Sequence, residues 1–188
     1  MSLKEQIEKY VPYNEQEGKD KEQILEFMNQ FEDVLTRKNI IGHFTSSAFV
    51  VNKERTKMAV VYHKIYDGWI YPGGHTDGEE DTLAVATREV EEEIGQKPKV
   101  CDNTFIALQT VAVKGHIKKG KYIAPHLHFD VIYLMEADDT IPLIYKDDES
   151  KGARWILLEE ATNETICDFA RPIHQKILEK LMNTNSKE

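Results

Sequence analysis

The residues best suited to chemistry are three glutamates in one short stretch of the chain. Glu89, Glu92 and Glu93 are spaced i, i+3, i+4, which on an α-helix places the three carboxylates on one side within an arc of roughly 100°. Like charges at this spacing repel one another, so the pattern favours a positive partner between them. A divalent cation that prefers oxygen ligands, Mg²⁺ or Mn²⁺, is the natural candidate.

A second stripe on the same stretch predicts how this helix is positioned. Its apolar members are three or four residues apart: Leu83, Ala86, Val90 and Ile94. This spacing predicts an amphipathic helix that packs on a sheet while its glutamates face a cleft. Gly95 follows the last apolar residue and is placed to end the helix.

The whole stretch resembles the Nudix signature, G-x5-E-x7-R-E-U-x-E-E-x-G-U, in which U is a bulky apolar residue. The residues in register are Gly74, Glu80, Arg88, Glu89, Val90, Glu92, Glu93 and Gly95. The last position departs from the signature, because Gln96 replaces an apolar residue. We expect that change to affect packing under the helix end and not the metal chemistry. The alternative, a solvated glutamate-rich helix, is the usual meaning of a charge run, but it does not explain the spacing from the glycine.

The resemblance implies roles for these residues. Glu89, Glu92 and Glu93 would be metal ligands, together with the backbone carbonyl of Gly74, and the ion would be Mg²⁺ or Mn²⁺. Arg88 would orient a box glutamate through a charge-assisted bond. In similar proteins the general base is either a box glutamate or a carboxylate on a later loop.

One later acid and three histidines are further candidates. Glu149 precedes a predicted strand and is our candidate for the distal acid, although its loop of acids also fits a merely solvated segment. His126 and His128 alternate with Asp130 on a presumed strand and so face one side. They would contact substrate, hold a second metal, or form a hydrogen-bonded polar strip. His75 would approach phosphate or cap the turn. The histidines without an assignment are His43, His63, His116 and His174.

Composition limits the class of partner. The net charge of the 188-residue chain is −9, which argues against nonspecific binding of nucleic acid or an anionic membrane. A nucleotide remains an acceptable substrate, since a bound cation changes the local sign of charge.

No apolar run approaches the ~20 residues of a membrane span, and the first residues lack the apolar core of a secretory signal. Cys101 and Cys167 form no metal spacing, so we expect reduced thiols and a cytoplasmic protein.

The remaining pattern predicts a layered fold. A short amphipathic segment at Leu3, Ile7 and Tyr10 precedes a helix over 20–37. A C-terminal helix covers 161–183, with a separate segment starting at Pro172. Strands are expected at 44–51, 57–63, 69–71, 105–113, 122–136 and 154–158, and a basic hairpin loop at 114–121.

Helices on both sides of these strands give an α/β class, and the resemblance implies a Nudix-type α/β/α sandwich with a mixed sheet. We divide the chain into an N-terminal helical extension (1–42), a Nudix hydrolase domain (43–183) and a C-terminal tail (184–188). The extension would pack across the domain, shape substrate access or make a homodimer contact.

The function implied is a metal-dependent Nudix hydrolase that cleaves a phosphoanhydride in a nucleoside diphosphate derivative, with compounds like ADP-ribose or a nucleotide sugar first. A house-cleaning nucleoside triphosphate pyrophosphohydrolase is the second reading. An isoprenoid diphosphate isomerase would need an acid–base thiol, and Cys101 has no evident partner. A non-catalytic nucleotide-binding regulator predicts damaged metal ligands, whereas these glutamates are intact.

Overall fold

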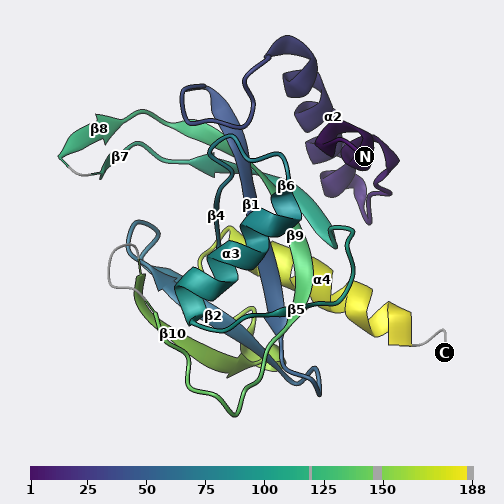
Figure 1. Ribbon diagram of the computed structural model, residues 1–188, viewed down its shortest axis with the longest axis vertical. Helices are drawn as coiled ribbons and strands as arrows, with labels where there is room; N and C mark the ends of the chain where they lie inside the picture. The colour runs from purple at the N-terminus through teal and green to yellow at the C-terminus, as the bar shows by residue number, and fades with distance from the viewer. Residues whose placement is uncertain (119, 146–149, 186–188) are drawn as a thin grey trace.

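A mixed β-sheet forms the centre of the molecule (Figure 1). The computed structural model describes residues 1–118, 120–145 and 150–185. Within them, eight strands form one sheet of order β10-β2-β1-β9-β5, in which β3 also pairs with β2, β4 with β1 and β6 with β9. Their bounds are β1 Gly42–Val51, β2 Lys57–His63, β3 Gly68–Ile70, β4 Gly73–His75, β5 Lys99–Val100, β6 Ala107–Val113, β9 His126–Glu136 and β10 Ser150–Leu157.

The central pair of strands, β1 and β9, runs parallel and sets the register of the polar residues. Every residue of β1 is buried, as expected for a strand covered on both faces. The pairing sets His43 beside His128 and Thr45 beside Asp130. Polar side chains from two distant segments therefore meet on one face of the sheet.

The two longest helices of the domain cover opposite faces of this sheet. Helix α3 (Thr82–Ile94) crosses the front in Figure 1, and α4 (Ala170–Asn185) lies behind. Ser46 of β1 donates a hydrogen bond to the carbonyl of Thr82 at 2.6 Å, whereas Phe49, on the other face, contacts the ring of His174 at 5.6 Å between centroids. The α/β/α sandwich with a mixed sheet is thus confirmed.

The local sequence explains where α3 begins and ends. The Asp81 side chain accepts a hydrogen bond from the amide of Ala84, which satisfies one of the unpaired N–H groups of the first turn. Gly95 ends the helix in a left-handed conformation, with φ of 72°, which glycine adopts without steric cost. The helix predicted from the glutamate and apolar stripes is therefore confirmed.

The N-terminal extension packs on the sheet and shares its core. It contains α1 (Leu3–Lys9) and α2 (Glu15–Gln30). Phe27 contacts the ring of Phe129 in β9, with centroids 4.5 Å apart, and Tyr10 contacts Phe105 at 5.0 Å. The division of the chain after residue 42 stays a prediction.

The helix predicted over 20–37 is wrong at both ends. It starts earlier, where the Asn14 side chain caps it, and ends at Gln30. Beyond it, Asp33 accepts a hydrogen bond from the amide of Thr36 at 3.0 Å. Such a local side-chain bond offers the backbone an alternative to the helix.

The C-terminal helix predicted over 161–183 is also shorter. A 3₁₀ turn, η1 (Leu158–Glu160), comes first, and α4 begins only at Ala170. Between them Trp69 accepts from Cys167 and donates to Thr165, at 2.9 and 3.0 Å. These backbone bonds hold the intervening turns beside β3, where Ile166 forms an isolated bridge with Trp69. Pro172 lies inside the first turn of α4 and does not start a separate segment, since a first turn tolerates the missing N–H.

The strand predicted over 122–136 is divided. A two-stranded ribbon, β7 (His116–Lys118) with β8 (Lys121–Ile123), replaces the predicted loop and the start of that strand, and β9 begins at His126. Pro125 lies at the break, because its missing N–H and fixed φ do not fit a continuous strand.

None of the helices in the described part of the chain is long and apolar enough to cross a membrane.

Gln96 is tied into the structure by its amide. It is buried, and its Nε2 donates to the carbonyls of Asp138 and Ile141 at 3.1 and 3.0 Å, while its Oε1 accepts from the amide of Asp138 at 3.2 Å. The polar residue at the last box position thus fastens the end of α3 to the loop after β9.

We expect Gln96→Leu to lower the free energy of unfolding by about 1–3 kcal/mol, because it leaves one N–H and two carbonyls of that loop without their partner. Urea unfolding followed by circular dichroism measures the change. Gln175→Leu, at an exposed site on α4, is the matched control and should stay within about 0.5 kcal/mol of wild type. Equal midpoints for the two variants would contradict the fastening role.

Candidate active site

Two of the box glutamates lie directly against the glycines of β4. The amide of Gly73 donates to Glu93 Oε2 at 2.9 Å, and Ser150 Oγ lies 3.5 Å from Glu93 Oε1. A Cβ at Gly74 would stand only 2.5 Å from the carboxyl carbon of Glu89. Glycine is therefore required at 74 for this close approach of helix and strand.

Arg88 lies within reach of two box carboxylates, Glu89 and Glu92. Its Nη2 is 3.5 Å from Glu89 Oε1, and its Nε is 4.0 Å from Glu92 Oε1. Glu92 is about half exposed, with 47% of its side chain accessible. Partly solvated carboxylates on one helix face, against a glycine backbone, form an oxygen-rich donor set that fits Mg²⁺ or Mn²⁺.

A cavity opens beside Glu93 and the glycines of β4, and the buried carboxylate of Asp130 lines it. Asp130 accepts hydrogen bonds from the hydroxyls of Thr45, Ser47 and Tyr71 at 2.9, 2.8 and 3.1 Å. Burial raises the pKa of the Asp130 carboxyl above its usual range, and these hydrogen bonds oppose that rise. Both carboxylate oxygens of Asp130 accept hydrogen bonds from neighbouring segments, so its role here is structural.

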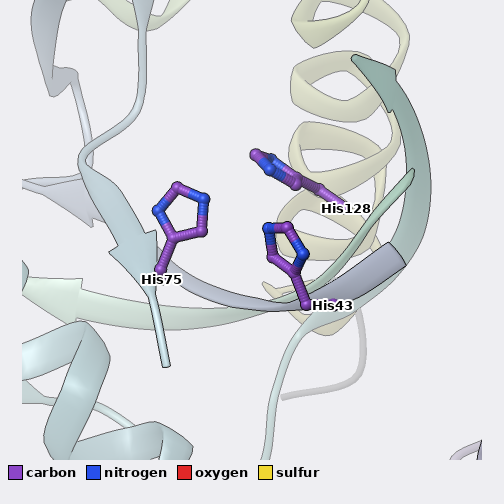
Figure 2. Close-up of side chains that lie close together, drawn as sticks. All are labelled: His43, His75 and His128. Atoms are coloured by element: carbon purple, nitrogen blue, oxygen red, sulfur yellow. The ribbon is translucent and has the colours of Figure 1, made fainter. Parts of the chain in front are cut away.

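Three histidines gather beside this cavity (Figure 2). His43 comes from β1, His75 from β4 and His128 from β9, and one ring nitrogen of each lies within 4.8 Å of the others. His126 joins them, since its Nε2 is 3.1 Å from Nε2 of His128. The structure thus brings together all three histidines singled out in the sequence.

His43 received no assignment from the sequence. Its place in the cluster follows from the parallel register of β1 and β9, which a single sequence does not reveal. Alternation along the strand gives no signal either, because the polar residue Ser46 interrupts the polar positions 43, 45 and 47. Two more unassigned histidines, His63 and His116, line the cavities beside this cluster.

Burial favours the neutral form of the imidazoles of His43, His75 and His128. Burial lowers the pKa of His128 to about 2 and that of His75 to about 3, and the neighbouring histidines lower it further for His128, as Arg37 does for His75. Burial also lowers the pKa of His43. Neutral rings keep a lone pair for a hydrogen bond or a ligand.

Two cavities share histidines of this cluster in their walls. The first contains Glu93 and Asp130, and the second, of about 410 Å³, contains Arg37 and Lys118. Both are lined by His63, Tyr66, His75 and His128. The predicted distal acid, Glu149, lies outside the described residues.

Comparisons with known proteins agree with this fold. A family model described as the NUDIX domain matches residues 43–181. The chain is 32% identical over 120 residues to CMP-5'-(N-acetyl-N-hydroxy-3-aminopropyl)phosphonate hydrolase from Streptomyces rubellomurinus, covering 62% of this chain and 52% of that protein. It is 31% identical over 117 residues to an RNA pyrophosphohydrolase from Pelagibacter ubique, covering 60% and 73%. The match thus spans about half the length of the first relative.

Solved structures give the same fold. A C. elegans Ap4A hydrolase binary complex superposes with a TM-score of 0.55 at 16% identity, covering 74% of this chain and 98% of that one. A NUDIX family hydrolase from Clostridium perfringens gives 0.53 at 20% identity, covering 74% and 97%. At such identities these likenesses concern the fold, and the family model carries the assignment. The chain belongs to the NUDIX domain family.

Proposed function

We propose that this protein is a metal-dependent Nudix hydrolase that cleaves a phosphoanhydride bond in a nucleoside diphosphate derivative. The observation that carries the proposal is the contact of Glu89 and Glu93 with the glycines of β4, at the edge of a cavity. Glu89, Glu92, Glu93 and the carbonyl of Gly74 would hold Mg²⁺ or Mn²⁺. When bound, the ion neutralises negative charge on phosphoryl oxygens and lowers the pKa of a water molecule.

The protein's own residues would position the carboxylates and receive a proton. Arg88, in reach of two box carboxylates, would hold Glu89 and Glu92 in orientation. The Gly73 amide does the same for Glu93. A box glutamate, or Glu149 on the later loop, would accept the proton of the attacking water.

The two adjoining cavities support a substrate with a phosphate centre and a second group. Lys118 in the second cavity would attract phosphate oxygens, beside Arg37, whose guanidinium pairs with both carboxylate oxygens of Asp77 at 2.7 and 2.5 Å. The same cavity offers apolar surface at Ile65 and Ile123. His75 and His128 line both cavities, and His126 lines the second one, so all three would contact substrate. This shape favours compounds like ADP-ribose or a nucleotide sugar.

The named activities of the relatives leave a second candidate open. One relative is named for a CMP-linked phosphonate and another for RNA pyrophosphohydrolysis, so a nucleoside triphosphate pyrophosphohydrolase is the alternative. A regulator without turnover is disfavoured because the carboxylates are intact.

We further propose a cytoplasmic protein that acts on small nucleotides and not on nucleic acid or membranes. Its N-terminal extension would be available for a homodimer contact.

A substrate panel tests the proposal. ADP-ribose, nucleotide sugars and nucleoside triphosphates would be incubated with Mg²⁺, Mn²⁺ or chelator, and a phosphatase that acts only on products would release inorganic phosphate. We expect turnover of a diphosphate derivative into two phosphorylated products and its loss with chelator. Preferential cleavage of triphosphates would favour the alternative, and chelator-resistant turnover would contradict the metal-dependent mechanism.

A further inference from the structure

We propose that His43, His75 and His128 form a binding site for a transition-metal ion, Zn²⁺ in the first place, separate from the carboxylate site on α3. The three rings come from three strands and converge on a shared centre (Figure 2). Their ring centroids are 4.8–5.1 Å apart. Three imidazole nitrogens on separate rigid strands are the ligand set of many zinc sites that keep a fourth position open.

A buried nitrogen without a partner points into this centre. His43 is only 4% exposed, and its Nε2 is buried without any hydrogen-bond partner. An unpaired buried polar atom costs about 1–3 kcal/mol, and native structures contain few of them. The hydrogen-bonded polar strip, which is the simpler reading of these histidines, does not satisfy this atom, whereas a metal ion would.

The other ring nitrogens are held as they are in metal sites. Nδ1 of His43 lies 3.2 Å from the carbonyl of Asn39, and Nδ1 of His126 lies 2.8 Å from that of Ala124. A carbonyl can only accept, so each Nδ1 carries the proton and each Nε2 keeps its lone pair. Metal-binding histidines show this same arrangement, in which an outer carbonyl fixes the tautomer and the ring orientation.

The ligand type distinguishes this ion from the one on α3. Imidazole nitrogen suits Zn²⁺, Co²⁺ or Ni²⁺, whereas Mg²⁺ takes oxygen ligands. A tetrahedral ion with Zn–N bonds of about 2.0–2.1 Å separates its ligating nitrogens by about 3.3–3.4 Å. The Nε2 atoms of His126 and His128, 3.1 Å apart, already stand close to this spacing. Side-chain rotations would bring the other nitrogens, now within 4.8 Å, to that spacing.

Cobalt titration tests the site without any substrate. The full chain without an affinity tag would be stripped with chelator, supplied with excess Mg²⁺ to fill oxygen sites, and titrated with Co²⁺ while its visible ligand-field absorption is recorded. We expect one Co²⁺ per chain, displaced by Zn²⁺ and not by more Mg²⁺. His43→Asn and His128→Asn should weaken Co²⁺ binding by at least the ~10–100-fold that loss of an outer-shell partner costs.

Two control variants distinguish cobalt bound at this cluster from cobalt bound elsewhere on the chain. His116→Asn removes a histidine whose ring is 6.2 Å from His126 and outside the cluster, so it should bind Co²⁺ as wild type does. Glu92→Gln, on the carboxylate site, should also keep the cobalt spectrum. Wild-type affinity in the His43 and His128 variants, or loss of binding in Glu92→Gln, would overturn the proposal.

Folding of the variants is checked by circular dichroism of the metal-free proteins. If His43→Asn does not fold, His75→Asn replaces it, because His75 is only partly buried. Thermal unfolding is then recorded at each Co²⁺ concentration. Added Co²⁺ should raise the melting temperature of the wild-type protein and not that of the histidine variants, because an ion that binds the native state stabilises it. Both readouts are independent of hydrolysis, so a failure here leaves the proposed function intact, and the reverse holds as well.

Discussion

Glu93→Gln should lower kcat by about 10²–10⁴-fold, the size of effect that removal of a group handling charge or protons in the transition state has. The amide side chain is nearly the same size, and its oxygen can still accept the hydrogen bond from Gly73. The fold around β4 should therefore persist while the negative charge beside the cavity is lost. Steady-state kinetics on the best substrate of the panel, over a range of Mg²⁺ concentrations, measures the effect.

Glu91→Gln is the matched control for this prediction. Glu91 is an exposed residue of the same helix, outside the stripe formed by residues 89, 92 and 93. The same loss of charge there should leave kcat within about twofold, since exposed charges are strongly screened. Wild-type turnover in Glu93→Gln, or an equal loss in Glu91→Gln, would remove Glu93 from the metal site. A decrease that excess Mg²⁺ reverses would show that Glu93 acts by binding the ion.

The parts of the fold that could be predicted were those with a local signal. The box helix carries its apolar period, its cap and its glycine stop within a short stretch, and β2 follows a β-branched run with its predicted bounds. The helix limits beyond Gln30 and before Ala170 were wrong, because hydrogen bonds to residues close in space outweighed the helical pattern there.

The candidate site also has a part that local spacing predicts and a part that depends on the pairing of distant strands. The contact of Glu89 with Gly74 lies within the box, so spacing alone pointed to it. The histidine cluster requires the register that joins β1 to β9, and that register depends on residues more than eighty positions apart. Alternation along β9 placed His126 and His128 on one side, but no pattern in a single sequence could bring His43 to them. The loop of Glu149 stays a prediction.

The second large effect concerns a buried charge cluster between the extension and the domain. Glu17 of α2 is fully buried, and its two oxygens pair with Lys176 at 3.0 Å and Lys180 at 3.2 Å, both from α4. The carboxylate also accepts hydrogen bonds from the amides of Tyr13 and Leu108 at 2.6 and 3.3 Å. One carboxylate thus joins the extension, the edge strand β6 and the last helix.

Glu17→Gln should lower the free energy of unfolding by about 3–5 kcal/mol, because it leaves the buried ammonium group of Lys176 and the partly buried one of Lys180 without this negative partner. That is a large part of the 5–15 kcal/mol typical of a domain. Urea unfolding at neutral pH measures it. Glu22→Gln removes an acid from the same helix whose pair with Lys19 is 68–69% exposed, and it should cost no more than about 1 kcal/mol. A similar small loss in Glu17→Gln would mean that water reaches the cluster.

The effect of Glu17 should depend on pH in a definite direction. Burial alone would raise the pKa of the Glu17 carboxyl, but the Tyr13 amide and the two lysines outweigh burial, so the pKa lies below the ordinary value of 4.5. A carboxyl with a lowered pKa in the folded state stabilises the protein fully above its ordinary value, and the contribution disappears as the pH falls through the lowered one. The difference in stability between wild type and Glu17→Gln should therefore be constant near neutral pH and shrink in acid. Because both proteins share every other titrating group, that difference isolates Glu17, and a gap that widened in acid would contradict the ionised pairing that holds the extension to the domain.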